Sequence, residues 1–538
     1  MTISIPGLGA SQKTPAVYLN VILGGPGTSA GAAPEKILLV GNLIGSALSG
    51  ASPAFSVSAG TMPVATPTFC ASASDAVALC GAGSELARMA SAVFAQYPSA
   101  NVYLCAVAES GGAAGAAALT VATTATGAGT VRLRLCEQVI DVAVASGDTA
   151  TVIAAAIADA INDNASLPYT AQNASGVVTI TAKHAGPRGN SLIVDAYIVT
   201  SASPVEQRVT SSGITSPFSS TFQWTSVGST IGAEYPLTGG STADNYTNAL
   251  AAVAAAKYGR IVVAANDATN IGRLVTHLNS LAAVTVGLRQ QGIAATIDTL
   301  ANATTLATGQ NSSRLQVAWH HASKVPGPEV AAVLAAARLA GDTAVGGVLG
   351  GESSDPAANL DGVQLAVLLA QTNVADQPTA TEIESALNNG LACVVPSSAR
   401  PGLTALSRSI TSRSLYLGVP NYAVIDTEFV TVCDYVADDL QSSLAVTYQG
   451  FKLGADSTNG TPPLAPNVTT PSLVRSFILD KLAGYEVRAI LRDVTANASL
   501  LAVQADPVVS GRLNCEIPCE PVSGLHIIAG NVRQLASL

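Results

Sequence analysis

Two separate stretches of this sequence alternate between strand and helix patterns, and this alternation constrains the fold more than any other feature. The first stretch predicts a buried strand over 36–41, a helix over 84–97 and a strand over 101–107. The second stretch continues the alternation with the segments 245–258, 261–264, 271–282, 315–319, 328–340 and 391–395. Repeated alternation of this kind predicts a largely parallel sheet with right-handed crossovers.

Glycines are expected to end two helices of the second stretch. Gly341 follows an Ala-rich helical segment, and Gly390 follows a segment in which Thr381 and Glu384 have the spacing of a capping box. The glycine-rich run 346–351 does not fit G-x-G-x-x-G and follows no clear strand, so it is expected to be a flexible loop.

Between the two alternating stretches lies a segment of different character. Val131, Leu133 and Leu135 alternate with arginines, which predicts a half-buried strand. A helix with isoleucines at four-residue spacing is expected over 148–162, and residues 200–230, rich in Ser and Thr, are expected to form a return loop. Further strands are predicted over 138–144, 177–182 and 191–199. The segment therefore predicts a separate strand-rich module.

Both ends of the sequence have strand patterns without a nearby hairpin partner. The patterns cover 16–23, where apolar residues recur at period two, and the tail 525–538. Such a strand pairs with a distant part of its own sheet or with another chain, and both alternatives are open. The candidate inter-subunit arm residues are Ala16, Val17, Tyr18, Leu19, Val21, Leu23, Leu525, Ile527, Ile528 and Val532.

These patterns predict an α/β and α+β multidomain fold. We expect a mixed-sheet α/β core, an inserted strand-rich module, an α+β C-terminal domain with helices over 429–444 and 472–482, and extended terminal strand arms. We predict an N-terminal arm over 1–30, followed by the first part of the core over 31–110 and the inserted module over 111–235. The second part of the core is predicted over 236–400, the C-terminal domain over 401–524 and the C-terminal arm over 525–538.

Composition excludes several classes of protein. Charged residues make up only 11% of the chain against about 25% in an average domain, and the formal net charge is −10. The sequence contains no cluster of Lys and Arg of the kind that indicates nucleic-acid binding. It also contains no run of about 18 apolar residues, which a membrane-spanning helix would need. The start has no basic segment followed by an apolar one, so we expect no secretory signal and eight free thiols. A surface poor in charge suits packing against copies of the same chain, although an Ala-rich composition alone also explains it.

Few residues suggest chemistry, and we predict no catalytic residue, no metal site and no cofactor. The sequence has no P-loop, H-E-x-x-H or G-x-S-x-G motif. His320 and His321 are adjacent and would face opposite sides of a strand, which makes a poor chelate. The pair at 515 and 519 lacks a second pair of zinc ligands, and the carboxylates at 438–439 are expected on a solvated helix face.

Nine short motifs occur along the chain in a specific order. They are residues 5–7, 14–18, 145–150, 176–182, 186–190, 408–411, 434–436, 511–512 and 531–533. In this order they resemble the contractile phage tail sheath family, in its Mu-like branch.

The resemblance implies a structural role. Sheath subunits form sixfold rings that stack as a helix around an inner tail tube, and contraction drives the tube through the host envelope. It further implies that the inserted module faces outward, that the terminal arms add strands to neighbouring subunits, and that the C-terminal domain lies near the tube. The implied partners are copies of the same chain, the tube protein, and the baseplate and tail terminator proteins, with no nucleic acid and no membrane insertion. The implied location is the virion tail, assembled in the host cytoplasm.

Two alternatives remain open at this point. One is another self-assembling shell or surface-layer protein, and the other is an α/β enzyme with an inserted module. For the sheath reading, the candidate residues that face the tube are Arg475, Lys481 and Arg488.

Overall fold

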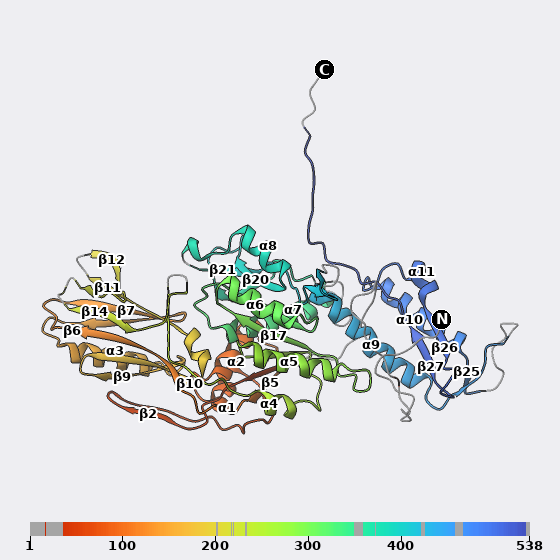
Figure 1. Ribbon diagram of the computed structural model, residues 1–538, viewed down its shortest axis with the longest axis horizontal. Helices are drawn as coiled ribbons and strands as arrows, with labels where there is room; N and C mark the ends of the chain where they lie inside the picture. Colours follow the sequence, from red (N-terminus) through yellow and green to blue (C-terminus); the bar gives the residue numbers. More distant parts are fainter. Residues whose placement is uncertain are drawn as a thin grey trace, which may run out of the picture.

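The computed structural model describes most of the chain and shows an elongated molecule (Figure 1). Two strand-rich sheets lie at one end, a large sheet covered by helices lies in the middle, and a smaller helical part lies at the other end. Among the described residues no helix is long and apolar enough to cross a membrane. The described residues are Val17, 36–200, 203–216, 218, 220–231, 234–348, 359–371, 373–420, 425–457 and 466–533.

A nine-stranded mixed sheet forms the middle of the molecule. Its six central strands run parallel, and antiparallel strands flank them on both edges. This confirms the predicted mixed-sheet α/β fold. In spatial order the strands are β19 (Gln364–Leu369), β21 (Leu403–Leu406), β20 (Leu391–Pro396), β18 (Leu315–Trp319), β17 (Gln291–Thr296), β16 (Arg260–Val263), β1 (Ile37–Gly41), β5 (Val102–Ala106) and β4 (Thr68–Cys70).

Helices cover both faces of this sheet, which explains why its central strands are continuously apolar. In β1 all five residues are buried, and their side chains alternate between two hydrophobic clusters. One cluster contains α2 (Glu85–Gln96) and α7 (Gly327–Val348). The other contains residues of α4 (Thr247–Ala252), α5 (Ala268–Leu281), α6 (Leu300–Gln310) and α8 (Ala380–Asn388).

Two predicted helix boundaries were wrong. The helix α7 continues through Gly341 and includes the first three residues of the expected glycine-rich loop. The capping box of α8 is formed by Thr379 and Glu382, with Glu382 N–H donating to Thr379 Oγ1 at 3.3 Å and Thr379 N–H donating to Glu382 Oε2 at 2.8 Å. The pair Thr379–Glu382 overlaps in sequence with the predicted pair Thr381–Glu384, and both fit the Thr-x-x-Glu motif. The sequence alone therefore did not select the pair that forms the capping box.

The strand-rich end consists of two five-stranded sheets and the helix α3 (Ala150–Asp163). Along the chain, α3 follows a strand of one sheet and precedes a strand of the other. The expected return loop over 200–230 was wrong, because three strands lie within it; Phe222 and Trp224 alternate with polar neighbours and are buried. The first sheet contains β13 (Ile214–Thr215), β14 (Thr221–Ser226), β6 (Ala114–Ala122), β10 (Val177–Ala185) and β9 (Tyr169–Ala174). The second contains β12 (Ser203–Arg208), β11 (Ile193–Thr200), β7 (Gly129–Leu135), β8 (Gln138–Val144) and β15 (Tyr235–Pro236).

The opposite end is built on two long helices, α9 (Thr427–Thr447) and α10 (Pro471–Val487), which share a hydrophobic cluster of their own. Both extend the predicted helices by several residues. The small elements of this part are β24 (Lys452–Leu453), β25 (Val468–Thr469), α11 (Val494–Asn497), β26 (Ala502–Ala505) and β27 (Leu513–Glu516). The pair β22 (Leu415–Tyr416) and β23 (Val419–Pro420) lies instead at the end of α6, where Asn311 Nδ2 donates to the carbonyl of Leu415 at 3.0 Å. The helix α1 (Ala73–Cys80) packs on α2 in the core. The hairpin of β2 (Leu48–Ala51) and β3 (Ala54–Val57) reaches the strand-rich end, where Asn173 N–H of β9 donates to the carbonyl of Ser52 at 2.7 Å (Figure 1).

Candidate functional site

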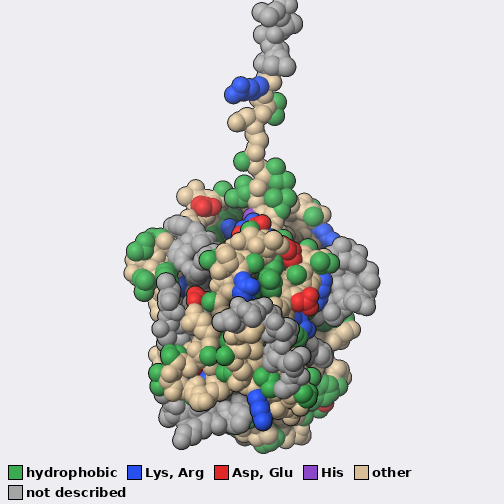
Figure 2. Space-filling view, turned by 90° about the vertical axis from the view of Figure 1, so that its right-hand side faces the viewer, with side chains coloured by type: hydrophobic (Ala, Val, Ile, Leu, Met, Phe, Trp, Pro, Cys, Tyr) green, Lys and Arg blue, Asp and Glu red, His purple; other side chains and the backbone are tan. Residues whose placement is uncertain are grey.

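The C-terminal tail leaves the body of the molecule as an extended segment, as Figures 1 and 2 show. Its described residues, up to 533, form no strand within this chain. Its apolar side chains face solvent, with exposed fractions of 72% for Leu525, 79% for Ile527, 84% for Ile528 and 103% for Val532. A row of exposed apolar side chains on an extended backbone is suited to binding another surface.

The predicted N-terminal arm lies outside the described residues, apart from Val17. Val17 is half-buried and packs against the hydrophobic cluster of α9 and α10. The other arm residues named from the sequence, Ala16, Tyr18, Leu19, Val21 and Leu23, are among those not described.

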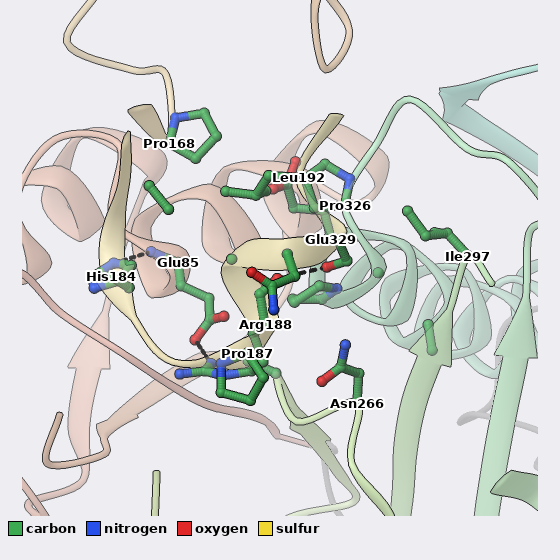
Figure 3. A pocket seen from close by; sticks show the side chains of 18 of the residues that line it. Glu85, Pro168, His184, Pro187, Arg188, Leu192, Asn266, Ile297, Pro326 and Glu329 are labelled. Atoms are coloured by element: carbon green, nitrogen blue, oxygen red, sulfur yellow. Dashed lines mark hydrogen bonds and ion pairs between the residues drawn. The ribbon is translucent and has the colours of Figure 1, made fainter. Parts of the chain in front are cut away.

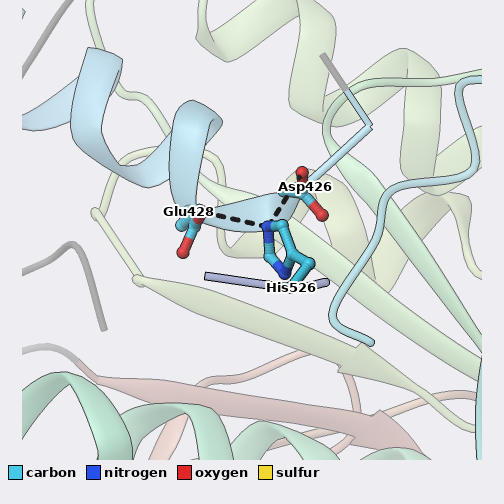
Figure 4. Close-up of side chains that lie close together, drawn as sticks. All are labelled: Asp426, Glu428 and His526. Carbon is cyan, nitrogen blue, oxygen red and sulfur yellow. Dashed lines mark ion pairs between the residues drawn. The ribbon is translucent and has the colours of Figure 1, made fainter. Parts of the chain in front are cut away.

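A group of ionisable side chains surrounds the point where the tail leaves the body (Figure 4). His526 of the tail lies with Nε2 3.7 Å from Asp426 Oδ2 and 3.8 Å from Glu428 Oε1, at the start of α9. Its Nδ1 lies 2.5 Å from Asp361 Oδ2, and Gly524 N–H donates to Glu428 Oε1 at 3.0 Å. Burial raises the pKa of Glu428 to about 7. Sequence reasoning missed this group, because its members are widely separated in the chain. The signal it offered was one histidine within a tail that has a single charged residue, Arg533.

Buried ion pairs join α9 to the central sheet. Arg314 donates from two guanidinium nitrogens to Asp434, at 2.7 and 2.8 Å, and Arg289 donates to Asp438 at 2.6 Å. Lys257 also pairs with Asp438. The carboxylates of Asp438 and Asp439, expected on a solvated helix face, are partly exposed and also make contacts within the chain. Asp439 accepts a hydrogen bond from the hydroxyl of Tyr485.

A second ionic junction joins the strand-rich sheets to the core (Figure 3). Arg188 lies in the short 3-10 helix Pro187–Ser191 and pairs with Glu85 at the start of α2 and with Asp244. Nearby, Arg88 Nε lies 2.8 Å from Glu329 Oε1 at the start of α7. Burial raises the pKa of Glu329 to about 7, against the opposing effect of Arg88. Glu85, Arg88, Arg188 and Glu329 border a cavity of about 270 Å³.

The three residues predicted to face the tube have different surroundings. Arg475 donates to the backbone carbonyls of Leu501 at 2.9 Å and Ala498 at 2.6 Å, so its guanidinium is used within its own domain. Lys481 Nζ lies 3.6 Å from Asp439. Arg488 is exposed and donates to the hydroxyl of Tyr435 at 3.1 Å. The structure therefore leaves Arg488 the most accessible of the three.

The remaining sequence candidates form no shared site. His320 is fully buried at the end of β18, whereas His321 Nδ1 lies 3.2 Å from the carbonyl oxygen of Asp298. Cys515 lies in β27 and Cys519 lies beyond it. All eight cysteines are free thiols, as predicted.

Comparison with known proteins identifies one curated relative. The chain is 27% identical over 197 residues to the Mu-like prophage FluMu tail sheath protein of Haemophilus influenzae. The match covers 36% of this chain and 37% of that protein, so it spans about a third of the relative's length. No family model matches the chain.

Two solved structures align over most of the chain. The sheath tail protein of Desulfitobacterium hafniense is 13% identical, with 93% of this chain and 99% of that chain covered and a TM-score of 0.44. The sheath tail protein Lin1278 of Listeria innocua is 14% identical, with 92% and 94% covered and a TM-score of 0.45. The sequence match to the curated relative confirms the resemblance to the Mu-like tail sheath family that the order of motifs predicted.

Proposed function

We propose that this chain is a structural subunit of a contractile phage tail sheath. In this role it polymerises as stacked sixfold rings around an inner tail tube, and contraction drives the tube through the host envelope. The resemblance to the Mu-like tail sheath family supports the role. The curated relative is a tail sheath protein, so we infer a structural and not a catalytic function.

The exposed apolar tail is the observation that carries the proposal. An extended segment can join the edge of a neighbour's sheet through main-chain hydrogen bonds, with side chains filling pockets. Burying each of Leu525, Ile527 and Ile528 in a neighbour would contribute about 1.5–3 kcal/mol, and each main-chain hydrogen bond about 0.5–1.5 kcal/mol net. Several such contacts give on the order of 10 kcal/mol before ordering costs, enough to keep subunits linked while weaker surfaces rearrange.

Electron microscopy of the purified full-length chain tests the proposal. At high salt and high concentration we expect hollow striated cylinders by negative stain. Discrete oligomers from the wild-type chain would contradict a sheath, and flat lattices would favour a surface-layer protein instead.

Two truncations then test the arms separately. Deleting 527–538, which keeps His526, should leave a folded monomer with a nearly unchanged unfolding midpoint that forms no cylinders. Deleting 1–24 should likewise leave a folded monomer that forms no cylinders. The matched control for the tail is Asn531→Ser, which removes no apolar side chain and should still assemble. Long tubes from either truncated chain would show that the corresponding arm does not link subunits.

We further propose that the C-terminal part faces the tube and the strand-rich sheets face outward. Lys481→Glu and Arg488→Glu together should prevent co-assembly with purified tube protein while the chain still folds. Co-assembly at the wild-type level would place the tube contact elsewhere. Arg475 is left unchanged in this test, because its hydrogen bonds to Leu501 and Ala498 stabilise its own domain.

A further inference from the structure

The side chains at the root of the tail come from three distant parts of the chain. Asp426 and Glu428 belong to the start of α9, His526 belongs to the tail, and Asp361 precedes β19 of the central sheet. Figure 4 shows the imidazole of His526 directed at the two carboxylates of α9. One ligand atom from each of Asp426, Glu428 and His526 lies within 4.8 Å of the others.

Asp361 fixes the orientation of the imidazole. Its Oδ2 lies 2.5 Å from Nδ1 of His526, a distance at which Nδ1–H donates to the carboxylate. That hydrogen bond directs the lone pair of Nε2 toward Asp426 and Glu428. Nε2 is buried and has no hydrogen-bond partner among the described residues. A carboxylate that holds the far nitrogen of a histidine is the usual support of a metal-binding imidazole.

The charges around the imidazole do not balance. The side chains of Asp426 and Glu428 are only 5% and 8% exposed. One guanidinium lies close, that of Arg408, which donates to both oxygens of Asp426 at 2.7 and 2.8 Å. Three carboxylates therefore face one guanidinium and one imidazole. Buried carboxylates are costly unless a cation pairs with them.

We propose that Asp426, Glu428 and His526 bind a divalent transition-metal ion, with Zn²⁺ the best match to one imidazole and two carboxylates. Zinc takes these ligands at about 2.0–2.2 Å in a tetrahedral arrangement, which places ligand atoms about 3.4 Å apart. The observed separations of 3.7 and 3.8 Å are too long for hydrogen bonds and close to that value. A water molecule would take the fourth position.

The bound ion would fasten the root of the tail to α9 and the central sheet. The tail would then leave the body in a fixed direction, with residues beyond 526 still exposed. This inference does not depend on what the tail binds, so its failure and the failure of the sheath proposal are distinguishable.

Metal titration of the full-length chain tests the site. After treatment with a chelator, isothermal titration with Zn²⁺ should give one equivalent that His526→Gln abolishes and Glu428→Gln weakens at least tenfold. Asp361→Asn should weaken binding by about 10–100-fold, the usual effect of losing a supporting carboxylate. His277→Gln, which removes an imidazole elsewhere, should keep the full equivalent.

Two measurements on the wild-type chain keep the test independent of variant folding. Co²⁺ should give visible d–d absorption without a thiolate charge-transfer band, and Zn²⁺ should slow amide hydrogen exchange over 522–526. A thiolate band, unchanged exchange in this segment, or full zinc binding by His526→Gln would each overturn the proposal.

Discussion

The body of the molecule and its C-terminal tail place polar and apolar groups in opposite environments. The body buries charged side chains and pairs them within the chain, as Arg188 and Arg314 show. The tail exposes the apolar side chains of Ile527 and Ile528 and has few charged residues beside them. The buried charges of the body are therefore paired within a single chain, whereas the isoleucines of the tail have no such cover, which makes the tail one place to search for partners.

The two tryptophans of the chain allow this comparison to be measured region by region. Trp224 lies in the strand-rich end and Trp319 lies in the central sheet. The variant Trp319→Phe keeps Trp224 and reports unfolding of the strand-rich end. The variant Trp224→Phe keeps Trp319 and reports unfolding of the central sheet.

The largest effect on stability is expected from breaking the buried junction at Arg188. Arg188→Met leaves Glu85 and Asp244 without their guanidinium, and it should lower the free energy of unfolding by about 3–5 kcal/mol. Urea unfolding monitored by Trp224 fluorescence measures this loss. The control is Arg132→Met, which removes a partly exposed pairing with Asp141 and Glu206 and should cost at most about 1 kcal/mol. Equal losses in the two variants would contradict the assignment of Arg188 to a buried junction.

The same substitution at two isoleucines sharpens the comparison further. Ile157 is buried on α3, so Ile157→Ala should destabilise the strand-rich end by about 2–5 kcal/mol. Ile527→Ala should stay within about 0.5 kcal/mol of the wild type, because its side chain makes no core contact in the single chain. Urea unfolding of the two variants under identical conditions measures both changes in the free energy of unfolding. A decrease above about 1 kcal/mol for Ile527→Ala would show that the tail packs on its own body.

The smallest effect, taken over one unit of pH, is a pH dependence from the core. Burial lowers the pKa of His320 to about 3 from its ordinary value of about 6.5, and neither ring nitrogen has a hydrogen-bond partner among the described residues. Below pH 6.5 the unfolded chain binds a proton that the folded chain does not. Stability that is present above pH 6.5 should therefore fall on acidification, and the slope should reach about 1.4 kcal/mol per pH unit once the pH is about one unit below 6.5.

The variant His320→Leu isolates this contribution. Between pH 6.5 and pH 5.5 the wild type should lose about 1 kcal/mol more than His320→Leu, measured by urea unfolding with Trp319 as the probe. Parallel pH profiles for the two chains would show that His320 can be protonated in the folded state.

Most elements of the central sheet could be predicted because their signals are local. The continuous apolar run of β1 and the amphipathic face of α2 appear in any short window of the sequence. The errors arose where local signals were ambiguous or weak. Two overlapping capping boxes compete near α8. A glycine does not by itself end a helix, and α7, whose residues 330–337 are buried in the core, continues through Gly341.

Of the candidate site, the sequence by itself determined the apolar pattern of the tail, its single histidine and the scarcity of charge. Only the tertiary structure decided that the tail leaves the body, that Arg475 is used within its own domain, and that His526 meets Asp361, Asp426 and Glu428. The physical reason is the distance along the chain over which each kind of signal acts. Periodicity and capping act between residues a few positions apart, whereas the pairing of buried charges depends on which distant segments the packed sheets and helices bring together.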